Sequence, residues 1–334
     1  MTPAPAAPAQ TDIDASLLTQ SASLASLRRV RGSGLVLAAC LLAFFTAPLW
    51  WPIDPAAVVA VPLQAPNLGQ PFGSDAEGRD LLARLLAGGR LAAIVGLGTA
   101  VLAVGVGAAL GTLAGWRGGL VDALLCRVAD VAAAFPGVLL ALLILFVAES
   151  PSAATVIVSL AATGWASSFR LVRGLVLALR RREDLLAVAL YGTSTPRLLA
   201  LHVAPEIAGP LAVQATFTSA SAVLGEASLS FLGFGPPSGA SWGALLEDGV
   251  LLALGSPWLL LLPAGALCVW QAGLLTLADG LRDWLDPRND ADLGAVTLAK
   301  NNRAGPDGAS VRLVGVGGSA SGASVPPPQE RRRP

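Results

Sequence analysis

The stretch EDLLAVALYGTSTPRLLALHVAP, residues 183–205, is a charged segment with a central turn that lies between two long apolar runs. Good helix formers fill residues 183–191, and Gly192 supplies the backbone conformation that commonly follows a helix end. Thr195 and Pro196 have the pattern of an N-cap followed by proline at the first helical position. The sequence therefore predicts two short helices joined at a glycine. At a membrane surface such an amphipathic pair is suited to dock against another protein or lipid headgroups, although a well-capped loop without a partner has the same pattern.

The composition is that of a membrane protein. Of the 334 residues, 54% are apolar and 13% are charged, whereas soluble domains average roughly 25% charged residues. The formal net charge is zero, so no basic surface indicates nucleic acid. Cys40, Cys126 and Cys268 are far apart and are best interpreted as small core residues rather than disulfide partners or metal ligands. We expect no bound metal and no cofactor.

Six apolar runs are long enough to cross a membrane, and they separate segments of different composition. We expect disordered tails, because both ends of the chain are rich in small residues and proline. The runs are residues 34–51, 91–115, about 128–148, about 152–169, a fifth from Pro205 into residues 225–243, and about 258–277. The expected organisation is a disordered tail at 1–27, a first transmembrane helix with an extracytoplasmic segment at 28–90, a core at 91–290 and a disordered tail at 291–334.

The distribution of positive charge predicts the orientation of these runs. Arg28, Arg29 and Arg31 precede the first run and would hold the N-terminus in the cytoplasm, and six crossings return the C-terminus to that side. In this topology 19 of the 22 lysines and arginines are cytoplasmic, and without the C-terminal tail the ratio is still 11 to 3.

The second run contains a row of small residues. Ala103, Gly107, Gly111 and Gly115 recur at a spacing of four, so one face of a helix here would be nearly bare backbone. We expect that face to pack closely against another helix.

Two acidic residues lie within the apolar runs and are candidates for a gate or a pathway: Asp130 and Glu226. Asp130 is about one turn from Arg127, so pairing or an interfacial position would explain it equally well. Glu226 carries the most costly intramembrane charge of the chain, and a structural, hydrogen-bonded role is an equal alternative to a gate.

Four separated motifs carry a family resemblance. The first is the spacing Ala187-Val188, Gly192 and His202-Val203-Ala204-Pro205, which resembles the EAA loop of ABC-transporter permeases, with Leu186 where that family usually has glutamate. The others resemble more narrowly the C-type permease subunit of binding-protein-dependent dipeptide, oligopeptide and nickel importers. They are GSDAEGRD at 73–80, GEASLSFLGFGPPSGASWG at 225–243 and DGLRDWLDPR at 279–288.

This resemblance implies an all-α permease with six transmembrane helices in a bacterial inner membrane and a cytoplasmic coupling loop between the fourth and fifth. The implied partners are a second permease, two ATP-binding subunits, an extracytoplasmic solute-binding protein and membrane lipid, with no nucleic acid. The resemblance implies peptides as the leading substrate class, and nickel or another small solute is the alternative. The residues implied to contact an ATPase are Glu183, Asp184, Ala187, Val188, Gly192, Thr195, Pro196, Arg197, His202 and Pro205.

Other function classes fit less well, and no residue is expected to be catalytic. The chain lacks a G-x-x-x-x-G-K-[ST] motif and its single lysine is Lys300, so any ATPase would be a separate polypeptide. Residues 239–243, GASWG, match the G-x-S-x-G pattern of serine hydrolases, but the available base, His202, would lie at the opposite membrane face. An ion-gradient-driven secondary transporter or channel is the stronger alternative, although such proteins usually carry several midplane ionisable groups.

Overall fold

The computed structural model describes residues 9–148, 152–236 and 240–285, and these residues form an all-α protein, as predicted. Within those ranges the β structure consists of two isolated bridges in the segment between the first two helices. The elements are α1 (Ala9–Trp50), α2 (Leu81–Arg117), α3 (Gly119–Ala134), α4 (Gly137–Val147), α5 (Ala153–Leu179), α6 (Glu183–Leu190), α7 (Thr195–Leu198), a π-helix (Leu199–Val203), α8 (Ala204–Phe231), α9 (Trp242–Leu252) and α10 (Trp258–Leu285).

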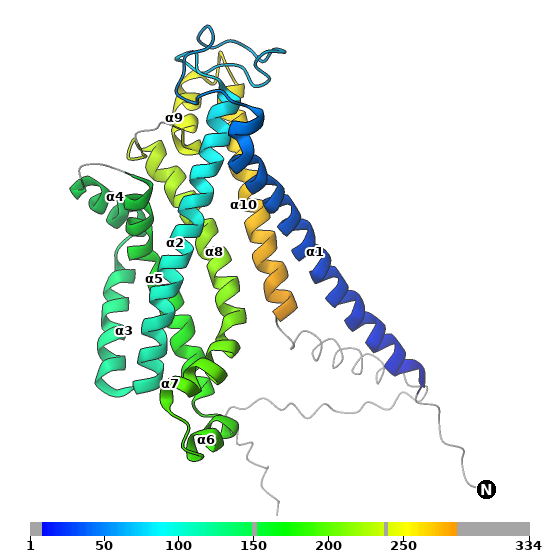
Figure 1. Cartoon of the computed structure of the whole chain (residues 1–334), viewed down its shortest axis with the longest axis vertical. Helices are drawn as coiled ribbons and strands as arrows, with labels where there is room; N and C mark the ends of the chain where they lie inside the picture. Colours follow the sequence, from blue (N-terminus) through cyan, green and yellow to red (C-terminus); the bar gives the residue numbers. More distant parts are fainter. Residues whose placement is uncertain (1–8, 149–151, 237–239, 286–334) are drawn as a thin grey trace, which may run out of the picture.

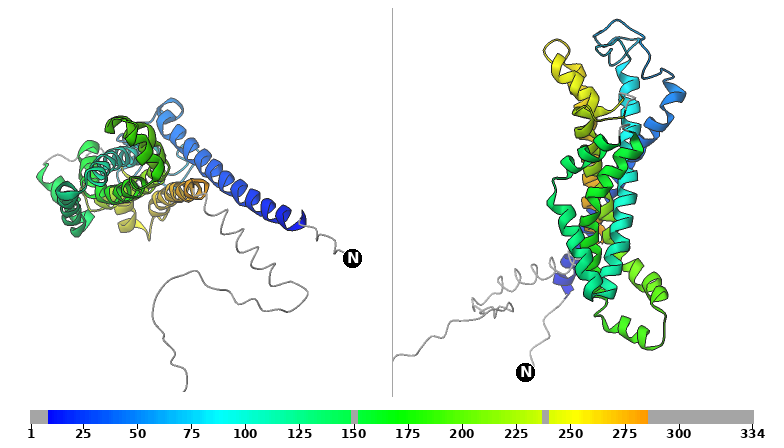
Figure 2. Two further views of the ribbon diagram at one scale, coloured as in Figure 1. Left: turned by 90° about the horizontal axis from the view of Figure 1, so that it is seen from below. Right: turned by 90° about the vertical axis from the view of Figure 1, so that its left-hand side faces the viewer.

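The long helices α2, α5 and α8 run side by side, and α1 diverges from them toward its N-terminal end (Figure 1). α2 packs most extensively against α5 and next against α8, while α1 packs against α10. Residues 51–80, which we call the cap segment, lie at the same end as α9, and α6 and α7 lie at the opposite end. Figure 2 shows the α6–α7 hairpin projecting beyond the ends of the long helices.

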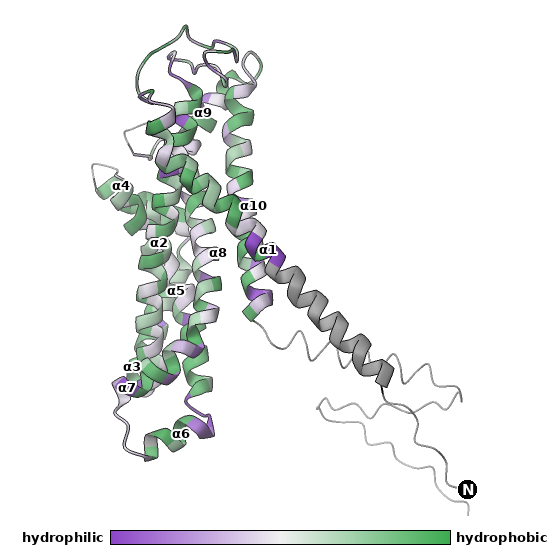
Figure 3. Cartoon of the chain, turned by 45° about the vertical axis from the view of Figure 1, so that its right-hand side comes forward, coloured by the Kyte–Doolittle hydropathy of each residue, from purple (hydrophilic) through white to green (hydrophobic). Residues whose placement is uncertain are grey.

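Five helical segments of the described chain are long and apolar enough to cross a membrane, and a bent pair makes a sixth. Hydrophobic residues recur along these helices in Figure 3. The five are Arg28–Trp50, Leu81–Arg117, Ala153–Leu179, Thr195–Phe231 and Trp258–Leu285.

The third predicted run is not one continuous helix. α3 and α4 meet at an angle of 88°, with the break at Phe135 and Pro136. Proline has no backbone N–H to donate and disfavours helical geometry in the residue before it, and Phe135 accordingly has an extended ψ of 136°.

The row of small residues in α2 packs closely against another helix, as predicted, and the structure identifies that helix as α5. A Cβ added to Gly107 would lie 2.6 Å from the carbonyl oxygen of Trp165, and one added to Gly111 would lie 2.7 Å from that of Phe169. The two helix backbones are therefore in direct contact from Gly107 to Gly111, about one helical turn, which small residues allow.

The N-terminal region differs from its predicted disorder, because α1 begins at Ala9. Residues 9–27 contain neither glycine nor proline and include several alanines and leucines, so the sequence does not interrupt a helix that continues from residue 28. The predicted C-terminal tail, residues 291–334, lies outside the described residues.

Candidate functional site

The loop at residues 183–205 forms two short helices joined at a glycine, as predicted. α6 ends at Leu190, and Gly192 has a φ of +82°, a conformation that costs little for glycine alone. Leu185 is buried in a cluster that includes Val176 of α5 and Ile207 of α8. The hairpin is therefore fixed to both neighbouring long helices through its inner face.

The second half of the loop differs from the prediction in two details. Ser194, rather than Thr195, occupies the N-cap position of α7, and it makes no side-chain capping bond. The helix then continues through the π-helix into α8, so the fifth span does not start at Pro205. Proline at 205 removes one backbone donor, and the π-turn just before it keeps the helix continuous with the Ala204 N–H bonded to the Leu199 carbonyl.

The predicted ATPase-contact residues lie together on this hairpin and on the start of α8. Val188 is half-buried against the cluster around Leu185. The other nine are exposed: Glu183, Asp184, Ala187, Gly192, Thr195, Pro196, Arg197, His202 and Pro205.

Arg182 links the hairpin to α8 and was not among the predicted site residues. It forms ion pairs with Asp184 at 2.8 Å and with Glu206 at 3.1 Å. The hydrogen bond from Arg182 holds the pKa of Asp184 below its ordinary value. These side chains, with His202 and Pro205, line a pocket of about 460 Å³. The run of three arginines at 180–182 was the available sequence signal.

The tip of the hairpin carries exposed apolar side chains. Leu190 is 89% and Tyr191 is 91% accessible, and Leu186 on the same helix is also exposed. Leu186 and Leu190 of α6, with Tyr191 directly after it, form a surface patch that is suited to contact another molecule.

Glu226 is buried and hydrogen-bonded. Its Oε1 accepts hydrogen bonds from the hydroxyls of Ser230 and Ser241, each at 2.7 Å. Ser241 also accepts the backbone N–H of Gly243 at 3.0 Å and so caps α9. A Cβ on Gly243 would lie 2.0 Å from the carbonyl oxygen of Ala227. This geometry supports the structural role for Glu226, which joins α8 to the start of α9.

Trp242 extends this junction to a third helix. It is buried, and its indole Nε1 donates to the Leu85 carbonyl of α2 at 2.9 Å. Its ring packs edge-on against Phe44 of α1 and Trp270 of α10. The S-W-G part of the motif thus ties α9 to the bundle. Ser241 is buried at the start of α9, whereas His202 follows α7, and α9 and α7 lie at opposite ends of the molecule. This separation removes the basis for a serine hydrolase at this pattern.

Asp130 lies on the exposed side of α3 and pairs with Arg170 at 3.2 Å, not with Arg127. A second ion pair, between Asp122 and Arg173 at 2.7 Å, also joins α3 to α5. Sequence reasoning missed Asp122, although its spacing of eight residues from Asp130 places both on one helix face.

The glycines of the cap motif allow two close backbone approaches. Gly73 and Gly78 have positive φ values of 76° and 79°. A Cβ on either would lie 2.3 Å from a carbonyl oxygen, that of Gln64 or that of Ala60. The cap segment is therefore folded back on itself at these two points.

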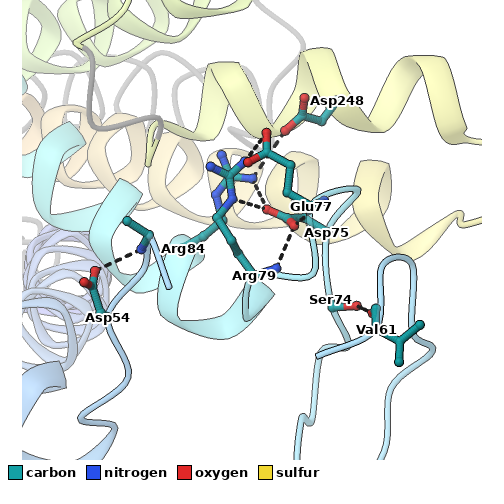
Figure 4. A network of polar contacts seen from close by, with 9 residues as sticks. Asp54, Val61, Ser74, Asp75, Glu77, Arg79, Arg84 and Asp248 are labelled. Atoms are coloured by element: carbon teal, nitrogen blue, oxygen red, sulfur yellow. Dashed lines mark hydrogen bonds and ion pairs between the residues drawn. The ribbon is translucent and has the colours of Figure 1, made fainter. Parts of the chain in front are cut away.

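Asp75 is the centre of a buried ion network that joins the cap segment to α2 and α9 (Figure 4). Its Oδ1 accepts the backbone N–H groups of Glu77 at 2.9 Å and Arg79 at 2.8 Å. Its Oδ2 accepts from Arg79 Nε at 2.8 Å and from Arg84, which also reaches Asp248 at 3.3 Å. Burial raises the pKa of Asp75, but the Arg79 hydrogen bonds and the Arg84 charge outweigh it, so the pKa lies below its ordinary value.

The remaining motif residues also have structural partners. Asp80 caps α2 by accepting the Ala83 N–H at 2.7 Å, and it accepts the Trp51 indole N–H at 3.2 Å. The Ser74 hydroxyl donates to the Val61 carbonyl at 2.6 Å. The motif thus builds a folded cap whose contacts fix the ends of α1, α2 and α9.

A bundle of apolar helices with a folded cap at one end and a projecting helical hairpin at the other is the organisation of a multi-pass membrane protein. The chain belongs to the family described as the binding-protein-dependent transport system inner membrane component, whose model matches residues 107–290. It is therefore a multi-pass inner-membrane permease subunit that works with the other components of an ABC importer, and it is not an enzyme.

The alignments with individual relatives cover most of the length of each relative. The oligopeptide transport system permease protein OppC of Bacillus subtilis is 39% identical over 218 residues, which are 65% of this chain and 71% of the relative. OppC of Mycobacterium tuberculosis is 36% identical over 265 residues, 78% of this chain and 91% of the relative. A putative peptide transport system permease protein of Brucella suis is 39% identical over 234 residues, 70% of this chain and 78% of the relative.

Proposed function

We propose that this permease imports peptides and that the hairpin at residues 183–205 couples it to a separate ATPase. The substrate class is inferred from the similarity to relatives that are named as oligopeptide and peptide permeases. Mass spectrometry of the ligand that co-purifies with the cognate solute-binding protein tests it. A peptide supports the proposal, and a metal ion or a sugar in its place overturns the substrate class.

The proposed complex contains a second permease, two ATP-binding subunits and an extracytoplasmic binding protein. The ATP-binding subunit would cover the exposed Leu186, Leu190 and Tyr191 of the hairpin. The cap segment would then lie on the extracytoplasmic side, with both termini cytoplasmic. The arginines at 180–182, beside the hairpin, support this orientation.

The connections of the hairpin suggest how movement would pass through the permease. α7, the π-helix and α8 form one continuous helix from Thr195 to Phe231. The far end of that helix carries Glu226, which bonds to Ser241 at the start of α9. A rotation imposed on the hairpin by an ATPase would therefore reach the cap-side end through one continuous helix. Rocking of this kind would open the pathway alternately to the two sides.

Substitution of Gly192 tests the coupling role. A Cβ at this glycine meets nothing within 4 Å, so within the chain Gly192→Ala adds only the cost of a positive φ, roughly 1 kcal/mol. Gly192→Arg carries the same cost plus a long charged side chain, which would obstruct a docked ATPase. We expect Gly192→Arg to reach the membrane in near-normal amount, to co-purify with less ATPase and to lose binding-protein-stimulated hydrolysis.

The alanine variant is the matched control in the same reconstituted complex, since it has the backbone strain without the bulk. It should retain most of the stimulated hydrolysis. Normal stimulation in Gly192→Arg would mean that the hairpin does not contact an ATPase. Solute uptake by the purified chain alone in a proton gradient would instead support a secondary transporter.

A further inference from the structure

A pocket of about 390 Å³ lies between the cap-side ends of α1 and α2. The apolar walls of the pocket are formed by Phe44 of α1, Trp51 of the cap segment and Leu86 of α2. The Trp51 indole is held by its hydrogen bond to Asp80, which caps α2, so the pocket wall is tied to both helices. None of the interactions assigned to transport involves this pocket.

Two opposite charges line the pocket without neutralising each other. Asp54 and Arg90 are both lining residues and both exposed, yet within the described chain neither forms an ion pair with the other or with a third group. Asp54 accepts only a local backbone N–H, from Ala56 at 2.9 Å. Arg90 lies over the ring of Phe45, 5.5 Å from its centroid. The site thus offers an unpaired anion and an unpaired cation to one ligand.

The two charges occupy different depths relative to a membrane. Arg90 immediately precedes the apolar run at residues 91–115, so it lies where the hydrocarbon ends and the phosphate groups begin. Trp50 and Trp51 at the end of α1 are side chains typical of this interface. Asp54 follows the end of α1 and therefore lies farther from the hydrocarbon than Arg90.

We propose that this pocket binds the headgroup of a zwitterionic aminophospholipid. The Arg90 guanidinium donates to the phosphate, and the Asp54 carboxylate accepts from the primary ammonium. Phe44, Leu86 and Ala87 line the apolar part of the same pocket, where they contact the glycerol and the first acyl carbons. Going outward from the hydrocarbon, the protein presents first the Arg90 cation and then the Asp54 anion. The lipid presents first its phosphate and then its ammonium group, so each charge meets its opposite. Bound there, the lipid joins α1 to α2 beside the cap segment.

Native mass spectrometry of the delipidated, full-length chain tests this site. The probes are dioleoyl phosphatidylethanolamine and dioleoyl phosphatidylglycerol, which share acyl chains and phosphate but differ in the ammonium group. We expect the ethanolamine lipid to bind more tightly. Asp54→Asn should lower the affinity for the ethanolamine lipid about ten-fold, because the charge-assisted bond to the ammonium is lost. The affinity for the glycerol lipid should stay the same or rise.

Arginine variants test the other half of the site. Arg90→Gln should lower the affinity for both lipids about ten-fold. Arg90→Lys should retain most of the affinity, because it keeps the positive charge. Arg127→Gln is the matched control, since Arg127 is an exposed arginine of α3 outside the pocket. Its affinities should equal those of the wild-type chain.

Three results would overturn the proposal. The first is equal affinity of the wild-type chain for both lipids, and the second is unchanged binding in Arg90→Gln. The third comes from a photoreactive residue in place of Ala87 in the assembled complex: a cross-link to a polypeptide instead of a phospholipid would show that a partner protein fills the pocket.

Discussion

Substitution of Gly111 tests the contact between α2 and α5 directly. A Cβ built on Gly111 would lie 2.7 Å from the carbonyl oxygen of Phe169 and 3.0 Å from the Cβ of Val172. Both distances are shorter than a carbon contact tolerates, and the nearest atom belongs to backbone. Gly111→Ala can therefore be accommodated only if the two helices move apart. Gly105 is a matched control on the same helix, because a Cβ there meets nothing within 4 Å.

The expected magnitude comes from the difference between these two variants. Replacing glycine by alanine inside a helix stabilises it by about 1 kcal/mol, and this gain is common to both positions. At Gly111 alone, overpacking costs about 1–3 kcal/mol. Gly105→Ala should thus be slightly more stable than the parent, and Gly111→Ala should be about 1–3 kcal/mol less stable than Gly105→Ala.

Thermal unfolding of the purified chain in detergent measures this difference through the fluorescence of its eight tryptophans. The isolated chain is preferable to the complex, because a partner subunit could cover the face that carries Gly105. Equal midpoints for the two alanine variants would refute the close backbone contact, since the helix-propensity gain is the same in both.

Two other predictions concern the cap segment and the topology. Because the folded pKa of Asp75 lies below its unfolded value of about 3.9, its stabilisation should be complete above that pH and lost as the pH falls through the folded pKa. The melting-temperature gap between wild type and Asp75→Asn should therefore shrink below about pH 4, and a constant gap would contradict the ion network. In intact cells, with native cysteines removed, Leu68→Cys should react with an impermeant thiol reagent and Ser194→Cys should not; the reverse would invert the proposed orientation.

Local features of the sequence were sufficient for much of the fold. The apolar runs predict the helices that can cross a membrane, because burial of apolar side chains in lipid depends on composition and length alone. Gly192 predicts the end of α6, because the conformation after a helix is a property of that residue. The small-residue spacing in α2 predicts a close helix contact without identifying α5 as its partner.

The interactions that position the candidate site required the tertiary structure. Arg84 and Asp248 are 164 residues apart, and Glu226 lies on α8 whereas Ser241 is the N-cap of α9, so neither pairing is encoded in a local period. The same holds for Asp122 with Arg173 and for the bent α3–α4 pair, whose angle depends on what each half packs against. Sequence composition determined which segments enter the membrane. The rotation and packing of the helices determined which polar side chains meet, because a buried charge is stable only where a partner is brought within hydrogen-bonding distance.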